Sequence, residues 1–235
     1  MNTAVIESAV RRICQEIYPS SRQFWWFSAS EAELLFELVA CILGSQVPYE
    51  VALAAAEEIR NVGLLENPIK QYCFPIYERA IYDILRQPLH NPGWAPTGRR
   101  YRFAKIRANH ISRTLWAIYS DGGSLKGRLG ACKTASEARR TIVELGVGIG
   151  PKQASLFLRN IGFTDELAIL DTHLLRFMRL FGLLHQAIRP ISSLQNYETI
   201  ENHLRYYAKR TGYSLGCVDQ AIWIVMRVYL QEARA

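Results

Sequence analysis

Apolar side chains recur every three or four positions along most of this sequence, and no other feature constrains the fold as strongly. Ser30 and Glu33 form a Ser-x-x-Glu capping box directly before one such stretch. The apolar positions that follow are Leu34, Leu35, Leu38, Val39 and Ile42. This spacing places the side chains on one face of a helix, which must then pack against other elements. Because alternating strand patterns do not line up anywhere, we predict an all-α fold.

The same spacing predicts further helices with loops between them. We expect helices over residues 49–60, 69–86 with an interruption at Pro75, 103–118, 134–145, 152–161, 172–181, 197–211 and 217–232. Residues 87–98 hold three prolines and two glycines, so they are predicted to form a loop. The sequence has no internal repeat of the kind that builds a solenoid.

The composition is that of a globular protein. Of the 235 residues, 49% are hydrophobic and 21% are charged, and the 15 glycines and 9 prolines are too few for a collagen-like or linker-like chain. The longest apolar runs are shorter than the roughly 20 residues that a membrane helix needs. Residues 1–20 lack a signal-peptide pattern, so we expect a cytoplasmic protein. The five cysteines are widely spaced without a Cys-x-x-Cys pair, and we therefore expect neither a disulfide framework nor a metal or other cofactor.

The positive charge is concentrated in one stretch. The chain has 28 Lys and Arg against 21 Asp and Glu, a formal net charge of +7, and Asp121 is the only acid between residues 84 and 136. The basic residues of this stretch are Arg86, Arg99, Arg100, Arg102, Lys105, Arg107, Arg113, Lys126, Arg128 and Lys133. Guanidinium groups bind phosphate in a bidentate manner, so the stretch is typical of a polyanion-binding face. A solvated basic surface that binds nothing is the alternative.

A glycine-rich turn, Gly-Val-Gly-Ile-Gly-Pro-Lys, occupies residues 146–152. A dinucleotide fingerprint would need a parallel sheet around it, and a nucleotide-triphosphatase loop would end in Gly-Lys-Ser/Thr. Neither fits, which leaves a tight hairpin between two helices, with Pro151 at the first position of the second helix. The amides of Gly148 and Gly150 could then hold one DNA phosphate. A purely structural helix–helix turn is the alternative.

Two longer segments carry a specific pattern: GIGPKQASLFLRNIG at residues 148–162 and AILDTHLLR at 168–176. Weaker patterns are CILGSQ at 41–46, YRF at 101–103 with Ala108, and DQAIW at 219–223. Together they resemble the helix-hairpin-helix DNA glycosylase superfamily, and within it the compact 8-oxoguanine DNA glycosylase/lyases of archaea and bacteria. The resemblance implies two helical subdomains with a cleft between them. Residues 1–40 and 165–235 would form one, and residues 41–164 a helical barrel that carries the helix-hairpin-helix at about 134–161.

The resemblance also implies catalytic roles for Lys152 and Asp171. Breaking a glycosidic bond builds positive charge on the sugar, which an ionised carboxylate such as Asp171 stabilises. A neutral amine at Lys152 can attack the sugar carbon, form a Schiff base and allow strand elimination. The helix over 152–161 and the connection after it are long enough to bring both side chains into one pocket. From the residues alone, Asp171 is also consistent with a helix N-cap and Lys152 with a phosphate-contacting lysine.

Other side chains would contact the DNA if the resemblance holds. Gln46 would fill the gap that a flipped base leaves in the duplex, and His173 would lie near the DNA backbone. A solvent-facing polar residue and an ordinary first-turn helix residue are the alternatives for these two. Contacts to phosphates would come from Arg99, Arg100 and Arg102.

Asp219 and Trp223 lie one helical turn apart, so a base could stack on the indole and bond the carboxylate. A buried core tryptophan is the alternative.

We therefore predict a monomeric base excision repair enzyme, a bifunctional DNA glycosylase/AP lyase whose partner is double-stranded DNA containing a damaged base, with no membrane. The first candidate base is 8-oxoguanine, and oxidised pyrimidines, alkylated purines and other modified bases are alternatives. The rival from another class is a non-catalytic helix-hairpin-helix module that uses the hairpin and the basic stretch only as a clamp on DNA.

Overall fold

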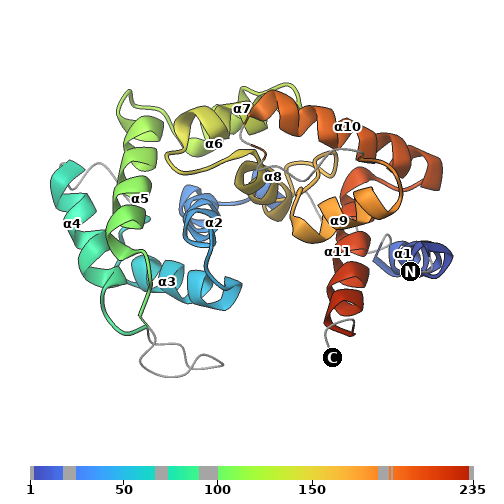
Figure 1. The fold of residues 1–235 in the computed structure, drawn as a ribbon. Coiled ribbons are helices and arrows are strands. Elements are labelled where there is room, and N and C mark those ends of the chain that lie inside the picture. Colours follow the sequence, from blue (N-terminus) through green and yellow to red (C-terminus); the bar gives the residue numbers. More distant parts are fainter. Residues whose placement is uncertain are drawn as a thin grey trace. The chain divides into compact units, whose positions relative to one another are not determined.

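A computed structural model describes residues 3–17, 25–66, 74–89, 100–184, 191 and 193–232, the last three without their side chains. This part of the chain forms eleven α-helices and one short 3-10 helix, and it contains no β-strand (Figure 1). An isolated bridge joins Pro88 to Arg100. The predicted all-α fold is confirmed. Among the described helices, none combines the length and apolarity needed to cross a bilayer.

The helices group into two compact units, which we describe separately. The central unit is the continuous segment 26–161, and the terminal unit combines residues 1–25 with 162–235. The expected boundary between residues 40 and 41 falls inside the helix α2 (Glu31–Leu43), which lies entirely within the central unit. Residues 26–40 group with the segment after them because α2 packs against helices of that segment.

The central unit is built around α2. Its other helices are α3 (Tyr49–Asn61), α4 (Phe74–Leu85), α5 (Ala104–Tyr119), α6 (Leu125–Gly130), α7 (Ala135–Leu145) and α8 (Pro151–Asn160), with the 3-10 helix η2 (Trp25–Phe27) at its start. The predicted capping box is present: the Ser30 hydroxyl accepts from the Glu33 amide at 3.3 Å, and the Glu33 carboxylate accepts from the Ser30 amide at 2.7 Å. Eight of the thirteen α2 residues are buried, because α2 contacts α3, α5, α6 and α8.

The terminal unit is built around its last helix. Its helices are α1 (Thr3–Ile17), α9 (Thr172–Leu180), α10 (Leu194–Thr211) and α11 (Leu215–Glu232), and α11 packs against the other three (Figure 1). Buried apolar residues from all four helices form one cluster, which includes Ile6, Val10, Leu174, Phe177, Leu204, Val218 and Ile222. This cluster makes the terminal unit a core of its own, although its two segments are far apart in the sequence.

The predicted helices are present with ends shifted by a few residues, and two helices were not predicted. These are α1 and the six-residue α6. Pro75 does not interrupt a helix but lies in the first turn of α4, where its missing N–H leaves no intrahelical bond unmade. Residues 69–73 of that prediction, and residues 90–98 of the predicted loop, lie outside the described part of the chain.

Candidate nucleic-acid interface and catalytic residues

The glycine-rich turn joins α7 to α8 as the predicted helix–hairpin–helix. α7 ends at Gly146, Gly148 adopts a left-handed conformation with φ of +73°, and Gly150 is the N-cap of α8 with Pro151 at its first position. The Val147 amide donates to the Thr114 hydroxyl of α5 at 2.9 Å, which fixes the turn to the core of its unit. Within the described chain the amides of Gly148 and Gly150 donate no hydrogen bond, so both are available to an anion.

Two of these glycines are required by close approach, and Gly148 is required by its conformation as well. A Cβ at Gly146 would lie 2.6 Å from the Ile142 carbonyl oxygen. A Cβ at Gly148 would lie 2.1 Å from Nδ1 of His110 on α5, in addition to the strain of its positive φ. The turn therefore packs against α5 so closely that no side chain fits between them.

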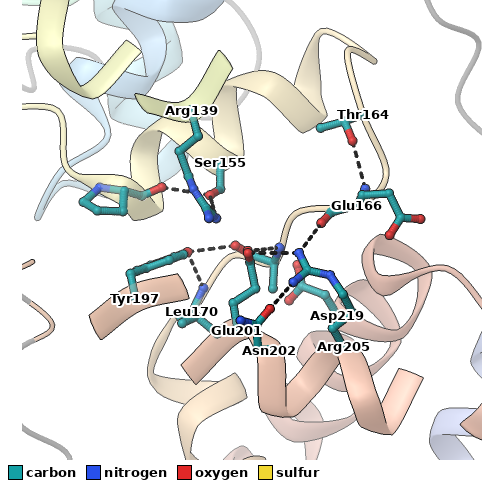
Figure 2. Close-up of polar contacts among 12 residues, drawn as sticks. Arg139, Ser155, Thr164, Glu166, Leu170, Tyr197, Glu201, Asn202, Arg205 and Asp219 are labelled. Carbon is teal, nitrogen blue, oxygen red and sulfur yellow. Dashed lines mark hydrogen bonds and ion pairs between the residues drawn. The ribbon is translucent and has the colours of Figure 1, made fainter. Parts of the chain in front are cut away.

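The two helices of the hairpin are joined internally by a buried arginine. Arg139 of α7 is fully buried and donates to the Ser155 hydroxyl of α8 at 3.3 Å (Figure 2). Ser155 in turn donates to the Pro151 carbonyl at 2.8 Å, in the first turn of the same helix. Sequence reasoning did not single out Arg139, because an arginine in a polar helix is usually exposed.

Lys152 lies in the first turn of α8, two residues after the Gly150 amide. Its side chain is exposed and has no hydrogen bond or ion pair with any described residue. The amine therefore lies beside a turn whose Gly148 and Gly150 amides also have no partner among the described residues.

Asp171 is the N-cap of α9, as its position in the sequence predicted. Its Oδ1 accepts from the Leu174 amide at 2.9 Å, and the residue is half-buried. Its Oδ2 has no hydrogen bond among the described residues. One oxygen therefore fixes the carboxylate to the helix, and the other remains available to interact with charge outside the chain.

The segment before Asp171, residues 168–170, is held at every residue by buried side chains of α10 and α11. Figure 2 shows the contact of Tyr197 with Leu170 and that of Glu201 with Arg205. Glu201 accepts from the Ala168 amide at 2.8 Å, and Asp219 accepts from the Ile169 amide at 3.1 Å. The Tyr197 hydroxyl accepts from the Leu170 amide at 2.9 Å and donates to the Ala168 carbonyl at 2.8 Å. We call Tyr197, Glu201 and Asp219 the clamp; their exposed fractions are 1%, 1% and 3%.

One of the two buried acids of the clamp, Glu201, has a compensating cation. Arg205, one turn after Glu201 on α10, lies 3.1 Å from its Oε2 and also donates to the Glu166 carbonyl at 2.9 Å (Figure 2). A carboxylate buried without such a partner would be costly, so Arg205 lets Glu201 remain a hydrogen-bond acceptor in the interior. Sequence reasoning missed Tyr197, Glu201 and Arg205, which occur in an unremarkable amphipathic helix.

The predicted base-binding pair has other interactions in its own unit. Asp219 bonds the backbone of the segment before Asp171, and Trp223 is 38% exposed with the Arg227 guanidinium 4.9 Å from its ring centroid. In the terminal unit Asp219 therefore positions backbone, and Trp223 presents part of its indole to the surface.

The remaining predicted DNA contacts are distributed over both units. His173, in the first turn of α9, is half-buried, and its Nδ1 has no hydrogen bond among the described residues. Gln46 is exposed in the loop after α2. Its φ is +62°, and no other described non-glycine residue has a positive φ. Arg100 and Arg102 are exposed, whereas Arg99 lies outside the described residues.

Three cations of the basic stretch are bonded to groups of the protein itself rather than free on its surface. Arg107 is 8% exposed and donates to the Ser45 carbonyl, and Lys126 donates to the Ala29 carbonyl at 2.8 Å. Arg128 bonds Asp121 at 2.7 Å together with carbonyls at the end of α5. The basic surface is therefore smaller than the sequence indicated. Its exposed described members in and after residue 100 are Arg100, Arg102, Lys105, Arg113 and Lys133.

The described residues contain no group of three or more His, Cys, Asp or Glu side chains arranged to hold a metal ion.

The two catalytic candidates belong to different units. Lys152 is part of the central unit and Asp171 is part of the terminal unit, and residues 162–170 connect them along the chain.

Comparisons with known proteins agree on one family. A sequence model of the family described as 8-oxoguanine DNA glycosylase matches residues 96–213. An 8-oxoguanine DNA glycosylase/AP lyase of Thermotoga petrophila is 30% identical over 198 residues, 84% of this chain and 82% of the relative. One of Saccharolobus islandicus is 34% identical over 126 residues, 53% of this chain. This chain spans 58% of the length of that relative.

Solved structures show the same fold. The crystal structure of the 8-oxoguanine DNA glycosylase of Thermotoga maritima is 25% identical, with a TM-score of 0.68 over 94% of this chain and 96% of that one. The enzyme of Methanocaldococcus jannaschii is 22% identical with a TM-score of 0.67, over 94% of this chain and 92% of that one. A structure of that enzyme with a 15mer DNA containing 8-oxoguanine has a TM-score of 0.61, at 23% identity over 94% and 88% of the two chains.

Proposed function

This chain belongs to the 8-oxoguanine DNA glycosylase family, and on that premise we propose that it is a DNA glycosylase/AP lyase that removes 8-oxoguanine from double-stranded DNA. One observation carries the proposal: the segment that matches the family contains both Lys152 and Asp171, each at the start of a helix. Lys152 has no bond to a described residue, and Asp171 uses only one of its two carboxylate oxygens to cap α9. A non-catalytic DNA-binding module needs the hairpin but neither the lysine nor the aspartate.

The proposed reaction uses Lys152 as nucleophile. Its neutral amine attacks C1′ of the damaged nucleotide, the C1′–N9 bond breaks, and the base leaves with the bonding electrons and takes up a proton. The sugar ring then opens to a Schiff base between the amine and C1′. Loss of a C2′ proton expels the 3′ phosphate and cleaves the strand, and water releases the amine by hydrolysing the Schiff base.

Asp171 contributes charge rather than a bond. Positive charge develops on the sugar as the base leaves, and the ionised carboxylate stabilises it. The Leu174 amide keeps Oδ1 in place and the clamp fixes the preceding backbone, so the carboxylate needs little reorganisation when the charge appears. Its Oδ2 supplies the interaction with the sugar.

The hairpin holds the DNA by its backbone. The free amides of Gly148 and Gly150, at the positive end of the α8 dipole, donate hydrogen bonds to one phosphate without reading the base sequence. The exposed cations Arg100, Arg102 and Lys105 add electrostatic binding, with Arg99 as a further candidate.

Borohydride trapping tests the nucleophile. With duplexes that carry 8-oxoguanine, an oxidised pyrimidine, an alkylated purine or an abasic site, reduction should link the native protein covalently to the 8-oxoguanine and abasic duplexes. Lys152→Gln keeps the side-chain length and polarity but should give no adduct, while lesion DNA still binds. If no duplex gave an adduct, the result would favour a non-catalytic helix-hairpin-helix module that only binds DNA.

Asp171→Asn tests the electrostatic role. Asparagine caps helices nearly as well as aspartate, so the unfolding free energy should change by well under ~1 kcal/mol. Base excision should nevertheless slow by about a hundredfold or more, since a neutral amide does not stabilise the charged sugar. Native excision with native stability would show that Asp171 is only a cap.

The salt dependence of binding tests the basic surface. Replacing Arg99, Arg100, Arg102 and Lys105 with alanine should flatten the slope of log affinity against log salt, by about 0.9 for each phosphate that these side chains neutralise. An unchanged slope would place the DNA elsewhere and leave the hairpin as its only proposed binding element.

A further inference from the structure

Arg107 is an arginine of the basic stretch that the fold uses internally. Its Nη2 donates to the Ser45 carbonyl at 3.1 Å, and its Nη1 lies 3.1 Å from Nδ1 of His110, one turn later on α5. A guanidinium has no acceptor, so Nδ1 of His110 must accept this bond, and the ring proton is then on Nε2. One buried side chain thus connects a loop, from 62 positions earlier in the sequence, to a histidine ring.

The loop end of this connection is the one that carries Gln46. α2 ends at Leu43, and its last carbonyls have no partner inside the helix. The Tyr101 hydroxyl donates to the Leu43 carbonyl at 2.6 Å, and Arg107 donates to that of Ser45. Gln46 then has a left-handed φ of +62°, a conformation that persists in a non-glycine residue only when its surroundings impose it.

At its other end the connection reaches the hairpin, because the His110 ring packs against Gly148. The His110 ring lies against Gly148 so closely that a Cβ there would lie 2.1 Å from Nδ1. One turn further along α5, the Thr114 hydroxyl accepts from the Val147 amide. Arg107, His110 and Thr114 follow one another at intervals of three and four positions and so share one face of α5.

We propose that Arg107 and His110 form a brace that fixes the Gln46 loop relative to the Gly148 hairpin, which makes Arg107 a positioning residue for base flipping. The inference rests on the proposed function. On DNA, the phosphate held by the hairpin and the gap beside the flipped base are separated by a distance that the duplex sets. The brace keeps the two protein elements at a matching separation before DNA arrives, so that Gln46 enters the gap without a rearrangement of its loop.

The chemistry of the brace requires arginine. The two donors point to acceptors on different elements, and both are satisfied by one planar group. Lysine carries one nitrogen on a flexible stem and so reaches one acceptor well, and glutamine supplies a single amide. Lysine therefore releases either the loop or the ring. Glutamine, whose side chain is two atoms shorter than that of arginine, releases both.

Hydrogen–deuterium exchange tests the brace in the DNA-free protein. Arg107→Gln should speed exchange by about tenfold or more at the hydrogen-bonded amides of both segments, Gly44 within residues 44–47 and Gly146, Val147 and Ile149 within residues 146–150. Arg128→Gln is the matched control, because Arg128, like Arg107, donates to a backbone carbonyl. Its acceptor is Ile118 at the end of α5, and it bonds neither the Gln46 loop nor the hairpin. It should affect the end of α5 and leave both segments unchanged. Equal protection of the two segments in Arg107→Gln and the native protein would overturn the brace.

Base flipping tests the consequence. With 2-aminopurine beside the lesion, Arg107→Gln should reduce the fluorescence gain on binding and slow single-turnover excision by about tenfold to a hundredfold, while trapping on an abasic site, which needs no flipped base, stays near native. In a Gln46→Ala background the same substitution should add little, since both act through one loop. An equal effect in both backgrounds would refute positioning through Gln46.

The histidine end has its own conservative test. His110→Asn places an amide oxygen near the position of Nδ1 and should keep most of the flipping signal, whereas His110→Ala removes the acceptor and should lower it as Arg107→Gln does. The opposite order would refute the role of His110. If the exchange results hold but the native protein neither excises nor traps any lesion, then the proposed function fails while the brace itself stands.

Discussion

Removing one oxygen atom from the clamp is the sharpest test of how Asp171 is held. Tyr197→Phe keeps the ring in its 1%-exposed site but deletes the hydroxyl that accepts from the Leu170 amide and donates to the Ala168 carbonyl. Leu170 and Ala168 are 4% and 0% exposed, so water does not replace the missing bonds. Each buried backbone group left unpaired costs about 1–3 kcal/mol, which sets the loss at about 2–6 kcal/mol for the pair. In a chain of this size that corresponds to a melting temperature lower by about 4–24 °C.

The same unit offers a matched control. Tyr207 is also buried, at 8% exposure, but its hydroxyl has no hydrogen bond among the described residues. Tyr207→Phe should therefore leave the stability unchanged or slightly raised. Urea denaturation of both variants, with single-turnover excision measured well below their melting temperatures, separates the two cases. Excision should slow only in Tyr197→Phe, because only that variant frees the backbone before Asp171. Equal stability of the two variants would show that the clamp contributes nothing measurable.

Single positions elsewhere in the chain give three further predictions. Gly148→Ala should lower both DNA affinity and stability, since its Cβ would overlap the His110 ring of α5. Gly122→Ala is the control: its φ of +81° is similar but the space around it is open, so it should lower only the stability. Equal affinities of the two variants in a binding titration would contradict this. Burial and nearby arginines lower the pKa of His110 below 6.5, so the unfolded chain takes up its proton first and the unfolding free energy should fall as pH drops below that value; His110→Asn should weaken this fall between about pH 7 and about pH 5. Burial raises the pKa of Cys14 to about 12, so a disulfide reagent at about pH 8 should leave it unmodified in the native protein while the partly exposed Cys132 reacts, and peptide mapping distinguishes the two.

The parts of the fold that the sequence predicts are those with local causes. The capping box at Ser30, the proline after Gly150 and the N-cap at Asp171 each set a helix end through residues no more than four positions away. The prediction of α2, α8 and α9 needed nothing else. By contrast, α1 is stabilised by packing on α11, and no local pattern shows that a helix near residue 10 has its partner near residue 220.

The site divides in the same way. The motif places Lys152 and Asp171 at helix starts, but it does not show what holds them. Glu201 accepts from an amide 33 positions earlier in the chain, and an acid in the middle of an amphipathic helix otherwise indicates solvent. Arg107 was counted with the phosphate-binding cations because a run of arginines usually marks a surface. It faces inward because the Ser45 carbonyl, in the loop after α2, needs a donor, and that carbonyl is 62 positions away.

The packing of α1 against α11 also has a consequence for synthesis. Cys14 and Cys217 face each other in that interface although 203 positions separate them. At about 5–20 residues per second, a ribosome completes α11 about 10–40 s after α1. Until then the apolar face of α1, with Ile6 and Val10, lacks the helix on which it packs, whereas residues 26–161 have already been synthesised. The hairpin segment is therefore synthesised in full before the core that places Asp171, and during that interval α1 is the segment on which a chaperone would act.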